Sequence, residues 1–129
     1  MVFIFDITMP KNGSSTNQHV EHLKLDKGLI KMLIIQIPAG HAGLTHFAIY
    51  RGDSQVWPKN ADKKFTGDNI VLPFDHEWYP LLVEPYELIF RGWNEDDTYD
   101  HTVYLYFQLL TKEQYLASKG VYWPEEGFV

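Results

Sequence analysis

The sequence predicts an all-β protein, namely an antiparallel β-sandwich that is jelly-roll-like, with a short C-terminal helix and extended termini. Between residues 37 and 110, short alternating apolar runs are separated by turn residues, and no stretch has the period of a long helix. The alternation is clearest at residues 102–109, where Val103 and every second residue after it are apolar. Two hairpins and their flanking strands give roughly eight strands, the number of a jelly roll.

Composition and charge exclude several classes of protein. A chain of 129 residues is expected to form a single domain, with the sandwich core at residues 19–110. The absence of cysteine excludes a disulfide framework and thiolate metal sites. With 17 acidic and 11 basic residues the net charge is -6, which argues against a nucleic-acid partner. The first residues lack the pattern of a signal peptide and no run is long enough to span a membrane, so we expect neither.

The first strand is expected at residues 2–8, with Phe3, Phe5 and Ile7 on one face. Pro10 ends this strand, and the Gly/Ser-rich residues up to 18 read as a flexible connection. We therefore expect residues 1–18 to be an N-terminal arm and its linker, in which residues 1–10 leave their own sheet and pair with, or pack on, a neighbouring subunit.

A second strand, at residues 20–25, leads through a tight turn into a third at residues 29–37 that is apolar at nearly every position. Such a strand is either central between two layers or covered by another subunit. The expected faces are Leu29, Leu33, Ile35 and Ile37 on one side and Ile30, Met32 and Ile34 on the other.

The remaining strands are expected at residues 44–50, 54–57, 70–72, 86–93 and 102–110. After them, Thr111 and Gln114 have the spacing of a capping box, which predicts a short helix that ends near Gly120. The last residues are too apolar for a solvated end, and we expect Tyr122, Trp123 and Phe128 to anchor this tail by burial.

Two patterns suggest metal ligands. Asn94, Asp96, Thr98 and Asp100 occupy every second position of an acidic loop, a spacing that favours calcium among the cations. The loop lacks the Gly and the distal Glu of a strong calcium site, and the same residues suit a hairpin tip whose side chains cap their own backbone. Four histidines, His19, His22, His41 and His46, lie in early segments, but their spacing is unlike that of a zinc site. We expect no metal and no cofactor.

Catalytic residue types are present without a catalytic pattern. Asp75, His76 and Glu77 supply acid–base groups, but no suitably placed serine and no Gly-rich phosphate loop accompanies them. Four aromatic residues at or near loop ends have side chains that could stack on sugar rings, or could equally pack in the core. These candidate ligand-binding residues are Trp57, Trp78, Trp93 and Tyr99.

The layout of strands and loops at residues 37–44, 48–50, 55–58 and 94–102 resembles that of small cysteine-free β-sandwich proteins of tailed bacteriophages and related virus particles. The resemblance covers about half of the chain and includes no catalytic signature. It implies a decoration or minor structural protein that sits on a capsid, often as an oligomer, and grips a neighbour with a terminal arm.

We therefore expect a non-enzymatic virion structural protein, made in the host cytoplasm, that acts as a capsid decoration or cement subunit. Its partners would be further copies of itself and other structural proteins such as a major capsid protein. The expected interface residues are Phe3, Phe5, Ile30, Met32, Ile34, Tyr122, Trp123 and Phe128. The alternative is a carbohydrate- or receptor-binding β-sandwich module, and a hydrolase is third.

Overall fold

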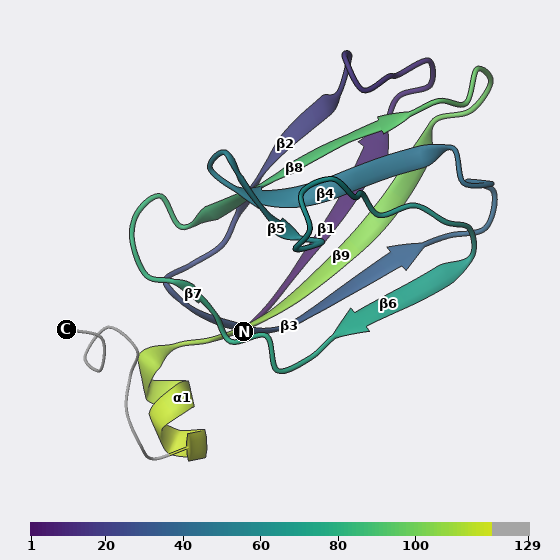
Figure 1. Cartoon of the computed structure of the whole chain (residues 1–129). Helices are drawn as coiled ribbons and strands as arrows, with labels where there is room; N and C mark the ends of the chain where they lie inside the picture. The colour runs from purple at the N-terminus through teal and green to yellow at the C-terminus, as the bar shows by residue number, and fades with distance from the viewer. Residues whose placement is uncertain (120–129) are drawn as a thin grey trace.

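This computed structural model describes residues 1–119, which form nine strands and one helix. Buried and exposed side chains alternate along the long strands. The strands are antiparallel and form two sheets that pack face to face (Figure 1). The elements are β1 (Val2–Met9), β2 (His19–Lys24), β3 (Gly28–Ile37), β4 (Thr45–Arg51), β5 (Ser54–Trp57), β6 (Ile70–Phe74), β7 (Tyr79–Leu81), β8 (Glu87–Asn94), β9 (His101–Leu110) and α1 (Lys112–Lys119).

The order of the strands is that of a jelly roll. Sheet I has the order β1-β9-β3-β6, with β7 pairing to the start of β3, and sheet II has the order β2-β8-β4-β5. The chain changes sheet at every step from β1 to β4, then from β5 to β6, from β7 to β8 and from β8 to β9, so strands distant in sequence lie side by side. The predicted all-β sandwich is confirmed.

The core lies between the two sheets and is built by every second residue of the long strands. β9 buries Val103, Leu105, Phe107 and Leu109, as its sequence pattern predicts. From the opposite sheet, the fully buried rings of Phe47 and Phe90 stack with their centroids 5.2 Å apart. Burial of one such side chain contributes roughly 1.5–3 kcal/mol, so this layer dominates the stability of the domain.

β3 departs from the predicted faces because a register shift interrupts it between Ile30 and Met32. A bulge of this kind inserts one residue and reverses the alternation on one side of it. Ile30 therefore points into the core with Leu33 and Ile35, while Leu29 is buried on the other face, so the predicted faces of Leu29 and Ile30 are wrong.

The expectation that residues 1–10 leave their own sheet as an arm is also wrong. β1 pairs with β9 along its whole length, from Val2 opposite Gln108 to Met9 opposite His101. The connection that follows is tied to the loop after β8, because Asn12 N donates to Asp96 O at 2.8 Å and Gly13 N donates to Asn94 O at 2.7 Å. These bonds hold β1 and the connection on their own domain.

The capping box predicted for α1 is confirmed. Thr111 N donates to Gln114 Oε1 at 3.0 Å, and Gln114 N donates to Thr111 Oγ1 at 3.2 Å. The predicted anchoring of Tyr122, Trp123 and Phe128 falls outside the described residues. Among residues 1–119, no helix has the length and apolarity needed to cross a membrane.

Gly92 is required by the close approach of β8 and β4. A Cβ at this position would lie 2.6 Å from Phe47 Cβ and 2.7 Å from the carbonyl oxygen of His46.

We expect Gly92→Ala to lower the free energy of unfolding by roughly 1–3 kcal/mol, the usual cost of overpacking, in urea titrations. Ser54→Ala, on the exposed start of β5, is the control and should change stability by less than about 0.5 kcal/mol. Equal stability of the two variants would contradict this.

Candidate functional site

An aromatic pocket lies on the side of the sandwich where β5 of sheet II faces β6 and β7 of sheet I. Its volume is about 580 Å³. Most of its lining is apolar or aromatic, with three polar residues among them. The lining residues are Gln55, Val56, Trp57, Pro58, Lys59, Phe65, Phe74, Glu77 and Tyr79.

Trp57 joins the two sides of the aromatic pocket. Only 5% of this residue is exposed, and its indole Nε1 donates to Glu77 Oε1 at 2.6 Å. Its ring packs against that of Tyr79, with the centroids 5.2 Å apart, and burial raises the pKa of the Tyr79 hydroxyl above its usual range. Because the indole and the carboxylate hold each other, this wall of the pocket is fixed before any ligand arrives.

Gln55 is used inside the protein rather than offered to a ligand. Its Nε2 donates to three backbone carbonyls of the following loop, at 2.8, 3.2 and 2.9 Å. Its Oε1 accepts a hydrogen bond from Lys64 Nζ at 3.0 Å. The aromatic pocket is therefore suited to apolar or ring-shaped groups, with the exposed Glu77 carboxylate as an acceptor at its rim.

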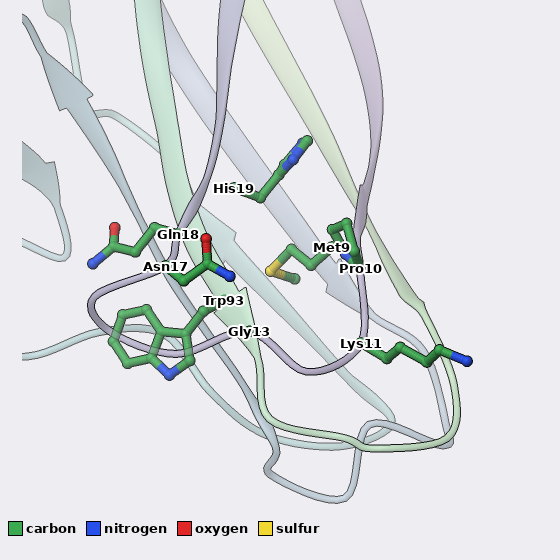
Figure 2. Close-up of a pocket in the computed structure, with 8 residues that line it drawn as sticks. All are labelled: Met9, Pro10, Lys11, Gly13, Asn17, Gln18, His19 and Trp93. Atoms are coloured by element: carbon green, nitrogen blue, oxygen red, sulfur yellow. The ribbon is translucent and has the colours of Figure 1, made fainter.

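A second, smaller cavity of about 160 Å³ lies at one end of the sandwich (Figure 2). It lies between the end of β1, the loop after it and the end of β8, where Figure 2 shows the Trp93 indole beside the loop that carries Gly13 and Asn17. The Trp93 ring stacks on His46 with centroids 5.0 Å apart, and His46 Nε2 lies 2.6 Å from Glu95 Oε1. Its lining residues are Met9, Pro10, Lys11, Gly13, Asn17, Gln18, His19 and Trp93.

The four aromatic residues predicted as ligand-binding do not form one platform. Trp57 lines the aromatic pocket and Trp93 lines the smaller cavity. Trp78 lies edge-on to the Tyr115 ring of α1, with centroids 5.7 Å apart, and Tyr99 is 67% exposed on the loop after β8. Phe65, Phe74 and Tyr79, which no local sequence pattern marks as ligand-binding, are three of the four aromatic residues that line the aromatic pocket.

The predicted calcium residues use their oxygens in the turn itself. Asn94 is buried, its Nδ2 donates to Met9 O and Tyr99 O, and its Oδ1 accepts from Asp96 N at 2.9 Å. Asp96 Oδ1 accepts from Thr98 N at 2.9 Å, and this bond, with the one from His101, lowers the pKa of the Asp96 carboxyl. Asp100 Oδ1 accepts from Lys11 N at 2.9 Å.

These contacts agree with the alternative interpretation of a self-capping hairpin tip. Within residues 1–119, no three His, Cys, Asp or Glu side chains are grouped so that they could hold a metal ion. His41 and His46, which the sequence places on either side of one loop, have separate partners in the structure.

The predicted interface residues that fall within residues 1–119 divide between the two faces of sheet I. Ile30 is fully buried in the core, so the prediction that it forms an interface is wrong. Phe3 and Phe5 are partly buried and pack against the core of their own domain. Met32 and Ile34 lie on the opposite face and are half-buried.

Apolar side chains form a row across that outer face of sheet I. The strand register places Ile4 beside Tyr106, Tyr106 beside Ile34, and Ile34 beside Pro73. Val2 and Ile4 are 64% and 63% exposed. The apolar and tyrosine side chains of this outer face of sheet I are Val2, Ile4, Met32, Ile34, Val71, Pro73, Tyr104 and Tyr106. Polar side chains of Asp6, Thr8, Gln36, Thr102 and Gln108 share the same face.

No protein-family model, curated protein or solved structure matches this chain.

His41 is a buried histidine that makes stability depend on pH. It is 2% exposed, its Nε2 donates to Thr102 O at 3.0 Å, and its Nδ1 lies 2.8 Å from Thr45 Oγ1, a hydroxyl that can donate to a neutral ring. Burial lowers the pKa of His41 below its usual range, with a smaller contribution from the neighbouring His101.

Because the unfolded chain binds this proton more readily, the stability that His41 contributes is present above about pH 6.5 and is lost as the pH falls toward its folded pKa. We therefore expect the free energy of unfolding to decrease between pH 7 and pH 5, and to decrease less steeply in His41→Gln. Urea titrations across this range measure both slopes. His22→Gln, at an exposed position, should keep the wild-type slope, and a wild-type slope in His41→Gln would refute the assignment.

Proposed function

We propose that this protein is a non-enzymatic structural subunit that packs the outer face of sheet I against other protein subunits. The observation that carries the proposal is the apolar row of Ile4, Tyr106, Ile34 and Pro73 across that face, flanked by the exposed Val2. Contiguous exposed apolar surface on a folded domain is typical of protein–protein contact. A tyrosine such as Tyr106 suits an interface, because its ring is apolar and its hydroxyl can form a hydrogen bond with the partner or with water.

The roles of the carboxylates support a structural protein. Asp68 Oδ1 accepts hydrogen bonds from Gly40 N and Ala42 N, both at 2.9 Å, and so holds the loop before β4. Asp75 Oδ1 accepts from the N–H of the next residue at 2.7 Å. These acidic side chains, like that of Asp96, are engaged in turns.

The jelly-roll order is shared by many capsid and lectin domains, and it agrees with the resemblance in loop layout to phage structural proteins. On this analogy, the proposed role is that of a decoration or cement subunit, or a minor structural subunit, of a virus particle. Its partners are then further copies of itself and a major capsid protein.

The proposal is tested with a charge on the outer face of sheet I. We expect Ile34→Lys to weaken self-association by about 10-fold or more. We expect the same loss in binding to particles of the virus that encodes this protein, when those particles are assembled without it. Loss of one buried aliphatic side chain costs roughly 1.5–3 kcal/mol, which corresponds to that factor. Sedimentation equilibrium and co-sedimentation with the particles measure the two affinities.

Val20→Lys is the matched control, because Val20 is 48% exposed on a strand of sheet II. It should leave both affinities unchanged. A wild-type protein that stays monomeric at all concentrations and does not bind the particles would refute the proposed function.

A second candidate function is ligand binding in the aromatic pocket, which favours a carbohydrate or receptor fragment with an apolar ring face. Tyr79 is partly exposed there and Glu77 offers an acceptor. If this pocket binds sugars, Tyr79→Ala should reduce the signal on a glycan array several-fold, since an aromatic contact is worth about 0.5–1.5 kcal/mol. Tyr99→Ala, at an exposed ring outside the pocket, should retain it. No glycan signal, or equal signals for both variants, would remove this candidate.

A further inference from the structure

The hydrogen bonds at the start of β1 determine which of its backbone groups face β9. Met1 N donates to Leu109 O at 2.7 Å, and Leu109 N donates to Met1 O at 2.8 Å, so this is a doubly bonded pair. In an antiparallel ladder such pairs alternate with pairs that are not bonded to each other. With the register of β1 on β9, the bonded residues are Phe3, Phe5, Ile7 and Met9.

The even residues of β1 therefore direct their N–H and C=O groups away from β9. These residues are Val2, Ile4, Asp6 and Thr8, and all four are exposed. Within residues 1–119, β1 pairs with no strand other than β9. The free edge of β1 thus presents four N–H and four C=O groups in the arrangement that an added antiparallel strand requires.

The other three edges of the sandwich carry features that discourage strand addition. β6 contains Pro73, and β7, which continues that edge, contains Pro80. β5 has only 4 residues and a register shift against β4, and β2 carries Glu21 and Lys24. Proline, charge, bulges and short length are the devices that protect natural sheet edges. β1 has 8 residues and a single charged one, so it is the edge open to pairing.

We propose that β1 pairs antiparallel with β1 of a second copy of this chain, across a two-fold axis near Phe5. This inference rests on the proposed function and adds its partner and mode of contact. In that register Val2 faces Thr8 of the second copy and Ile4 faces Asp6 of the second copy, so all four outward-facing residues pair. A register centred on Asp6 would place two carboxylates directly opposite each other, which is unfavourable.

A second copy is the occupant that the strand itself favours. β1 is the open edge among residues 1–119, so the matching edge of a second copy is β1 itself, and pairing about a two-fold axis gives the isologous contact of most dimers. The pairing also continues sheet I from one subunit into the next, with Ile4 of each copy beside Asp6 of the other. The diagonal Asp6 carboxylates and the net charge of -6 oppose the contact, so the dimer is expected to tighten as salt rises.

The substitution Ile4→Pro tests edge pairing through the backbone of β1. The Ile4 N–H points away from β9, so Ile4→Pro keeps the ladder within the subunit but removes a donor and blocks the approach of a second strand. We expect the dissociation constant from sedimentation equilibrium to rise at least about 10-fold. The matched control Ile4→Thr loses the same apolar side chain from the outer face of sheet I but retains the N–H and β-branching, so it should dimerise clearly more tightly than Ile4→Pro. Asp6→Asn should dimerise more tightly than wild type. Equal dimerisation of the proline and threonine variants would overturn the inference.

Amide hydrogen exchange tests the same pairing without a substitution, in case Ile4→Pro disturbs the fold. In wild-type protein, the amides of Ile4 and Asp6 should exchange rapidly at low concentration and become protected at high concentration. The amides of Phe3, Phe5 and Ile7 should be protected at both concentrations. Absence of any change at Ile4 and Asp6 while the mass doubles would also overturn the inference.

The combined results separate this inference from the proposed function. Self-association that Ile34→Lys weakens and Ile4→Pro leaves unchanged would overturn edge pairing and support packing by the outer face of sheet I. A chain that stays monomeric in solution but gains protection at Ile4 and Asp6 on particles would overturn the second copy as occupant, with the edge filled by another protein. A chain that neither self-associates nor binds particles would overturn both.

Discussion

β9 hydrogen-bonds to β1 along one side and to β3 along the other, and these two ladders place the rest of sheet I. Its inward side chains, from Val103 to Leu109, fill the core against sheet II, while its outward side chains include Tyr104 and Tyr106. One strand thus determines both the buried layer and the face through which we propose that the protein assembles. Its first residue, His101, connects it to the loop that holds Asp96, with the two side chains 2.8 Å apart.

The sequence was sufficient to predict most strands and the sandwich, because each long strand has one apolar face and clear turn residues at its ends. It was not sufficient for β3. A bulge between Ile30 and Met32 leaves no mark in a run where every residue is apolar, so the alternation was assigned without the shift. The connection after Pro10 was also misread. Its composition is that of a flexible linker, yet Asn12 and Gly13 donate to backbone carbonyls about 80 residues away, which no local pattern indicates.

The candidate sites were predictable only in part, for the same reason. Trp57 and the self-capping role of Asp96 follow from local sequence, the first from its residue type and the second from Asx spacing. Phe65, Phe74 and Tyr79 come from segments with little periodicity and meet only because two sheet edges face each other. On β1, the sequence favours Phe3 and Phe5 as interface residues because they are large and apolar, yet they lie on the inward face. Val2 and Ile4 are the apolar residues on the outward face.

The pairing of the first strand with the last has a consequence for how the chain is made. Val2 meets Gln108, so during synthesis β1 has no ladder partner until about 100 further residues have been added. At roughly 5–20 residues per second, the ribosome needs several seconds or more for this interval. During this interval β1, which contains two phenylalanines, is exposed outside the exit tunnel because β9 and the core around it have not yet formed. The nascent chain therefore passes through a period in which chaperone binding competes with aggregation, and the last residues of β9 end that period.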